Sequence, residues 1–235
     1  MSEPSLISFV DNKAMAARLG DVIEAQLARA IAEKGAASFA VSGGSTPAAL
    51  YDALSERDLH WEKVRVLLVD ERWVAPGEAG SNETFVRDTL IKNKAAGATL
   101  NGLWREGMAP ATAADALNSE LSDLFSACDA VVLGMGNDGH TASWFPHAEG
   151  LDAALSTDAL VAAVRAAPGD VVGAHRDRVT MTLPAVERAR FVCLLMAGAE
   201  KRKTFEAVRA PGAVEDHPVR AILKARPDLW ACWAA

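Results

Sequence analysis

The amino-acid sequence predicts an α/β fold with a doubly wound, mainly parallel sheet and helices on both of its faces. Short apolar runs of strand length alternate with longer segments whose apolar residues recur at helical spacing, as expected when helices cross over between parallel strands. Polar, glycine-rich clusters follow several of the apolar runs. Open parallel sheets bind ligands beyond the carboxyl ends of their strands, so a site is expected at that edge.

In the N-terminal half, the longest helix is expected over residues 12–33, where Met15, Leu19 and Val22 recur at helical spacing. Apolar runs of four to six residues predict the strands, and the segments between them predict the helices. The strands expected here are residues 6–9, 38–41 and 64–69, and the helices are residues 12–33, 47–54 and 82–92.

The C-terminal half continues the same alternation, and its strands are expected to join the parallel sheet through crossover helices. Stretches rich in proline and glycine are short and separate periodic segments as loops do, so residues 1–235 are expected to form a single domain. The strands expected here are residues 130–133, 160–164, 179–183 and 191–196, and the helices are residues 112–124, 201–208 and 219–224.

Composition narrows the class of function. A chain of 235 residues with 50% hydrophobic and 23% charged residues is typical of a globular protein, and no segment resembles a signal peptide or a membrane span. The net charge of -7 argues against a nucleic-acid partner, which would need a clustered positive surface. Three cysteines, Cys128, Cys193 and Cys232, stand among apolar residues and suit free thiols, which favours the cytoplasm.

The most informative stretch is the glycine-rich turn that follows the expected strand 130–133. It reads Gly134-Met135-Gly136-Asn137-Asp138-Gly139-His140 and places an imidazole and a carboxylate at the end of a buried strand. This arrangement favours acid/base chemistry by His140. The same glycines match the spacing of a dinucleotide-binding turn, an interpretation we rank lower because Asp138 would face the pyrophosphate with a like charge.

A second cluster, residues 42–47, follows the expected strand 38–41 and predicts an anion cradle. Gly43 and Gly44 would expose backbone amides, Ser45 and Thr46 would add hydroxyls, and Thr46 and Pro47 would be the N-cap and first residue of the next helix. Amides that converge at a helix N-terminus bind phosphate without a lysine. The alternative is a capped turn without a ligand.

Charged groups follow two further strands. Arg72, in the cluster of residues 70–73, offers a planar fork that fits phosphate or carboxylate oxygens. Lys201, in the cluster of residues 197–201, stands near a helix start and could reach the same edge. Taken alone, the cluster of residues 70–73 is interpreted as a solvated strand end and Lys201 as a surface lysine. Taken together with the other clusters that follow strands, they favour one shared site.

Taken in order along nearly the whole chain, these motifs resemble the 6-phosphogluconolactonases of the glucosamine-6-phosphate isomerase/6-phosphogluconolactonase family. The resemblance rests on residues 42–47, 70–73, 81–82, 134–146, 178–184 and 198–201. It implies a Rossmann-like fold and hydrolysis of 6-phospho-D-glucono-1,5-lactone, the second step of the oxidative pentose phosphate pathway. No cofactor, metal, nucleic acid or membrane is implied, and the chain is expected to be a monomer or a dimer.

The resemblance also implies residue roles. His140 would take a proton from the attacking water, and Asp138 would orient His140, although two residues apart in a tight turn is an awkward spacing. Candidate oxyanion donors are the amides of residues 136–139 or Arg72. Whether Arg176, Arg178 or Lys201 contacts the phosphate is left open. The substrate-binding residues implied are Gly43, Gly44, Ser45, Thr46, Asp70, Arg72, Asn82, Gly139, Arg178 and Lys201.

Three alternatives remain. In a glucosamine-6-phosphate deaminase, Asp70 would move a carbon-bound proton, but such enzymes carry Asn-Glu-Pro where this chain has Trp144-Phe145-Pro146, and Glu149 could replace that carboxylate only if the loop folded back. A sugar-phosphate sensor would keep the cradle without needing His140. A metal site is disfavoured because the histidines and Asp138 lack a ligand spacing.

Overall fold

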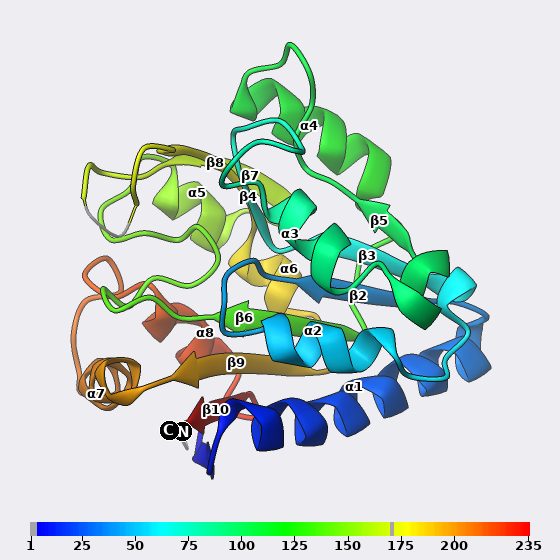
Figure 1. Ribbon diagram of the computed structural model, residues 1–235. Helices are drawn as coiled ribbons and strands as arrows, with labels where there is room; N and C mark the ends of the chain where they lie inside the picture. Colours follow the sequence, from blue (N-terminus) through cyan, green and yellow to red (C-terminus); the bar gives the residue numbers. More distant parts are fainter. Residues whose placement is uncertain (1–3, 170–171) are drawn as a thin grey trace.

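The chain folds around a seven-stranded sheet in the order β1-β10-β9-β6-β2-β3-β5, in which every neighbouring pair is parallel. The structure is a computed structural model that describes residues 4–169 and 172–235. Figure 1 shows α1 and α2 in front of this sheet and α6 and α8 behind it, which confirms the doubly wound α/β prediction. The strands of the sheet are β1 (Leu6–Phe9), β2 (Ala37–Val41), β3 (Val64–Leu68), β5 (Thr99–Asn101), β6 (Ala130–Gly134), β9 (Val192–Ala197) and β10 (Trp230–Ala234).

Eight α-helices are described, and six of them match expected ones in position. They are α1 (Asn12–Lys34), α2 (Ala48–Ser55), α3 (Asn82–Thr89), α4 (Pro110–Leu121), α5 (Leu151–Ser156), α6 (Leu183–Glu187), α7 (Ala199–Val208) and α8 (Val219–Ala225). The helix expected over residues 82–92 ends early at Thr89, and the one expected over residues 112–124 covers Pro110–Leu121 instead. Short 3-10 helices, η1 (Trp61–Lys63) and η2 (Asn93–Gly97), precede β3 and β5.

A second, three-stranded antiparallel sheet corrects the expectation that all strands join the parallel sheet. It has the order β4-β8-β7, with β4 (Asp70–Arg72), β7 (Val161–Arg165) and β8 (Asp177–Met181). The chain leaves β3 at Val69, whose amide still bonds to Val41 in the main sheet while its carbonyl accepts from Met181. Apolar runs indicate strands but not their partners, so the pairing expected for residues 160–164 and 179–183 was wrong. The latter strand also ends early, because Thr182 caps α6 by accepting a hydrogen bond from Ala185 N.

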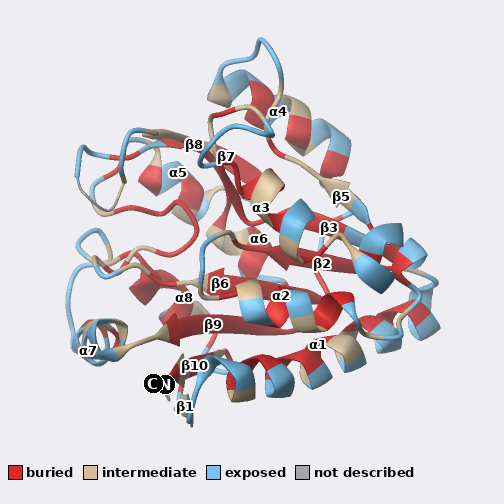
Figure 2. Cartoon of the chain, in the orientation of Figure 1, coloured by how far each residue is buried: buried red, intermediate tan, exposed pale blue. Residues whose placement is uncertain are grey.

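The core lies between the parallel sheet and its helices. All five residues of β2 are buried, as are five of the six of β9, which is typical of a sheet covered on both faces. Helix α1 turns Leu19, Ile23 and Leu27 onto the sheet, and Figure 2 shows its outer face exposed. Each such buried side chain stabilises the fold by about 1.5–3 kcal/mol.

No helix in the described part of the chain combines the length and apolar character needed to cross a bilayer. Within residues 4–169 and 172–235 there is also no group of three histidine, cysteine or acidic side chains placed to hold a metal ion.

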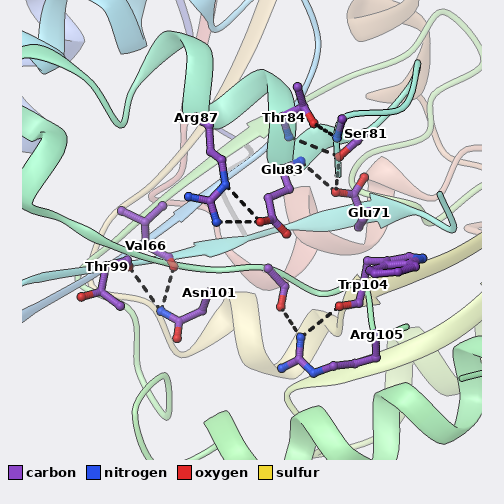
Figure 3. A network of polar contacts seen from close by, with 12 residues as sticks. Val66, Glu71, Ser81, Glu83, Thr84, Arg87, Thr99, Asn101, Trp104 and Arg105 are labelled. Carbon is purple, nitrogen blue, oxygen red and sulfur yellow. Dashed lines mark hydrogen bonds and ion pairs between the residues drawn. The ribbon is translucent and has the colours of Figure 1, made fainter. Parts of the chain in front are cut away.

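Helix α3, which begins at the site edge, is held at its N-terminus by the buried carboxylate of Glu71 (Figure 3). One oxygen accepts hydrogen bonds from Arg72 N at 2.8 Å and Asn82 N at 2.7 Å. The other accepts from Glu83 N at 2.7 Å and Ser81 Oγ at 3.3 Å. Because both oxygens face only donors, Glu71 fixes the position of α3 relative to β4.

We predict that Glu71→Gln lowers the free energy of unfolding by about 1–3 kcal/mol, because the new amide group turns its own N–H atoms toward buried donors. Urea unfolding measures the change. The control is Glu206→Gln, which removes an exposed ion pair with Arg202 and should cost no more than about 0.5 kcal/mol. Equal losses in the two variants would contradict the role assigned to Glu71.

Candidate active site

A cavity of about 240 Å³ lies at the carboxyl ends of β2, β3 and β6 and beside the start of α7. Figure 1 shows the arrows of β6 and β9 pointing to this edge. The cavity is lined by Ser42, Gly43, Gly44, Ser45, Thr46, Pro47, Asp70, Arg72, Asn82, Gly134, Met135, Gly136, His140, Ala142 and Lys201. A larger cavity of about 550 Å³ beside α7 and α8 contains none of the predicted site residues.

His140 and Asp138 form a direct pair at the edge of this cavity. The distance between His140 Nδ1 and Asp138 Oδ1 is 2.6 Å, and the same oxygen accepts a hydrogen bond from His140 N at 3.1 Å. The contact favours the tautomer with its proton on Nδ1, which leaves Nε2 as the acceptor. Burial is the largest single influence and opposes ionisation of Asp138, but the hydrogen bonds to this carboxylate and the charge interaction with His140 together outweigh it and lower the pKa of Asp138.

The backbone of the turn explains how a carboxylate two residues away reaches the ring. Gly136 N donates to His140 O at 2.9 Å and Gly139 N donates to Gly136 O at 3.1 Å, so the chain folds back on itself. Gly139 has φ +80°, and a Cβ on Gly136 would overlap the imidazole of His140. The amides of Gly136 and Gly139 are occupied by these bonds, so neither serves as the oxyanion donor considered from the sequence.

The aromatic ring of Phe145 packs against the imidazole of His140. Its ring centroid lies 4.3 Å from that of His140, with the two planes inclined by 33°. The guanidinium of Arg178 lies 5.5 Å from the centroid of Phe145. The sequence motif contained Phe145, but no pattern in the sequence assigned it a contact with His140.

The loop after β2 presents unused donors. The amides of Gly43, Gly44, Ser45 and Thr46 donate to no protein group among the described residues. Gly44 has φ +97°. The predicted cap is displaced, because α2 begins at Ala48, Pro47 occupies the cap position and no side chain caps the helix. Thr46 is therefore not the cap, and its hydroxyl makes no capping bond.

Asn82 joins this loop to the charged groups of β4. Its Oδ1 accepts from Arg72 Nη1 at 2.7 Å, and its Nδ2 donates to Asp70 O at 2.8 Å. A Cβ on Gly43 would overlap Asn82, so only glycine allows this close approach. Asp70 is buried and accepts from Ser143 Oγ at 2.6 Å. Ser143 lies within residues 134–146 and contacts a site residue, but sequence reasoning left it without a role.

The three basic candidates take different places. Lys201 lines the cavity and, within the described part of the chain, forms no ion pair; burial lowers its pKa. Arg178, opposite Arg72 in the β4–β8 ladder, is 3% exposed and does not line the cavity. Its Nε donates to His175 O at 2.9 Å, and burial lowers its pKa. Arg176 donates to Ala166 O instead.

Comparison with known proteins places this site in a family. The profile described as "Glucosamine-6-phosphate isomerases/6-phosphogluconolactonase" matches residues 10–231, nearly the whole chain. The chain belongs to this family. It is 39% identical over 227 residues to a 6-phosphogluconolactonase of Rhizobium meliloti, covering 96% of this chain and 97% of the relative. A 6-phosphogluconolactonase of Neisseria meningitidis serogroup A is 40% identical over 215 residues, with 91% of each chain covered.

Solved structures of family members have the same fold. The crystal structure of a 6-phosphogluconolactonase from Shewanella baltica superposes with a TM-score of 0.92 at 36% identity, covering 99% of this chain and 98% of that one. A monomeric glucosamine-6-phosphate deaminase has a TM-score of 0.79 at 14% identity, covering 98% of this chain and 97% of that one. The second likeness is one of fold alone.

We predict that Gly136→Ala lowers the free energy of unfolding by about 1–3 kcal/mol, because its Cβ must displace the His140 ring and would come within 2.7 Å of Asp138 Oδ1. The matched variant is Gly134→Ala, whose Cβ would meet only Ser42 Oγ, at 3.9 Å. Urea unfolding of both variants measures the difference. A Gly136→Ala protein as stable as the Gly134→Ala protein would show that the ring is not confined at this glycine.

Proposed function

We propose that this protein hydrolyses 6-phospho-D-glucono-1,5-lactone to 6-phosphogluconate, the second step of the oxidative pentose phosphate pathway. The observation that carries the proposal is the His140–Asp138 pair at the edge of a cavity whose other walls hold free amides and cations. Relatives named 6-phosphogluconolactonase, 39–40% identical over more than nine-tenths of the chain, support it. The reaction consumes only water, so the proposal includes no cofactor.

The phosphate of the substrate is assigned to the loop after β2. Four amides that have no partner among the described residues, together with the hydroxyls of Ser45 and Thr46, supply donors there, and Lys201 and Arg72 supply positive charge. A phosphate ester carries about -1.5 to -2 charges at neutral pH, which this acidic protein must balance locally. Arg178, buried behind Arg72, adds positive potential without lining the cavity. Asp70 and Asn82 are assigned to the sugar hydroxyls.

His140 then acts as general base. Its Nε2 takes one proton from a water molecule while the water oxygen bonds to the lactone carbonyl carbon. The tetrahedral intermediate collapses by breaking the bond to the ring oxygen, and Nε2 returns the proton to that oxygen. Asp138 stabilises the imidazolium formed between these steps and keeps the ring in its tautomer. Candidate donors for the developing oxyanion are the amide of Asn137 and Arg72.

The deaminase alternative loses support from the loop after the turn. Glu149, the one carboxylate that could take the place of the missing Asn-Glu-Pro glutamate, is exposed and does not line the cavity. Its backbone pairs with Arg165 in both directions, at 3.0 and 2.9 Å. The loop therefore does not fold back toward Asp70. The three described cysteines are free and buried, which supports the cytoplasm as the proposed location.

We predict that the wild-type protein accelerates lactone hydrolysis above the spontaneous rate and that His140→Ala lowers kcat at least about a hundredfold without loss of folding. Glucose-6-phosphate dehydrogenase generates the lactone, and NADP-linked 6-phosphogluconate dehydrogenase reads the product. Folding is checked by circular dichroism. Near-wild-type turnover in His140→Ala would refute the assigned base, and ammonia release from glucosamine 6-phosphate without lactone hydrolysis would favour the deaminase.

A further inference from the structure

We propose that Thr204 and His217 are positioning residues that hold the turn 137–139 from outside and so set the Asp138 carboxylate against His140. Three consecutive carbonyls of the turn accept hydrogen bonds from the C-terminal part of the chain. Thr204 Oγ1 donates to Asn137 O at 3.1 Å, and His217 Nδ1 contacts Asp138 O at 2.9 Å. The backbone amide of Val219, the first residue of α8, donates to Gly139 O at 2.9 Å.

These contacts act where the turn cannot support itself. Two backbone hydrogen bonds lie within the turn, from Gly136 N to His140 O and from Gly139 N to Gly136 O. Neither bond involves the carbonyl of Asp138. The position of that carbonyl fixes ψ of Asp138 and φ of Gly139, and these angles place His140 relative to the Asp138 side chain. Glycine-rich backbone has many accessible conformations, so an external bond is needed to select one.

His217 is suited to this contact in two respects. A carbonyl oxygen can only accept a hydrogen bond, so Nδ1 of His217 carries a proton in this contact, in the neutral Nδ1–H tautomer or in the cation alike. The imidazole also packs on Gly139, where a Cβ would come within 2.7 Å of Nδ1. The ring therefore holds Gly139 by contact and Asp138 by a hydrogen bond.

Thr204 connects the turn to the proposed phosphate end of the cavity. It lies three residues after Lys201 in α7, and residues three apart lie on one face of a helix. Lys201 lines the cavity, while Thr204 bonds to Asn137. One helix thus fixes both a cation for the phosphate and the turn that carries the base.

The kinetic test uses pairs of variants that differ in one donor. In His217→Asn the amide nitrogen replaces Nδ1, and in Thr204→Ser the hydroxyl remains, whereas His217→Ala and Thr204→Val remove the donor. Misplacement of a catalytic group lowers the rate of the chemical step and leaves substrate binding unchanged. We therefore expect kcat to fall about tenfold in His217→Ala and in Thr204→Val, with KM unchanged. The Asn and Ser variants should stay within about twofold of wild type.

The control is His147→Asn. His147 pairs on the surface with Asp216, the residue before His217, and has φ +53°, a conformation that asparagine tolerates. It should leave kcat unchanged. Wild-type kcat in His217→Ala, or equal losses in His217→Ala and His217→Asn, would overturn the positioning role.

A second measurement does not depend on turnover, which matters because the kinetic test rests on the proposed function. Two-bond ¹H–¹⁵N correlation spectra report which imidazole nitrogen carries the proton, and His140→Ala assigns the His140 signals. We expect His140 to hold its proton on Nδ1 in wild type and His217→Asn and to shift toward the Nε2–H tautomer in His217→Ala. Unchanged His140 signals in His217→Ala would refute the proposal, and a wild-type protein without lactonase activity would refute the proposed function alone.

Discussion

The 2.6 Å contact between Asp138 Oδ1 and His140 Nδ1 is the interaction on which the geometry of the site depends. It directs the second ring nitrogen away from Asp138 and requires a turn in which the chain reverses within five residues. That reversal needs a glycine at position 136, where a side chain would overlap the imidazole, and a positive φ at Gly139. The turn is anchored by β6, a central strand whose first four residues are buried. The contact between Asp138 and His140 therefore depends on the glycines of the turn and on the buried strand β6 that precedes it.

Charge is distributed so that an acidic protein can hold an anion. The formal net charge is -7, yet the cavity at the sheet edge is lined by Arg72 and Lys201 and by loop amides that bond to no group in the described part of the protein. Among the described residues Asp70 is the one carboxylate that lines the cavity, and one of its oxygens accepts a hydrogen bond from Ser143 Oγ. These local donors and cations suit an anionic ligand in spite of the negative net charge.

Much of this arrangement is predictable from sequence because its signals are local. The strand before Gly134, the glycines of the turn and the loop after β2 can be recognised within windows of ten residues, and they do meet at one edge. The pairing of β8 with β7 and β4 was missed because an apolar run does not specify its partner strand. Arg178 matches a motif, but its burial behind Arg72 depends on that pairing. Thr204 and His217 lie 67 and 79 residues from their partners in the turn, so no local pattern could link them.

The measurement that tests the central claim most directly is a crystal structure of the protein with 6-phosphogluconate, the proposed product. The account predicts that the phosphate accepts hydrogen bonds from the amides of residues 43–46 and from Lys201 Nζ. It also predicts that the carboxylate at C1 lies within hydrogen-bond distance of His140 Nε2, with the Asp138 contact intact. A product bound with its phosphate beside His140, or bound outside this cavity, would contradict the account.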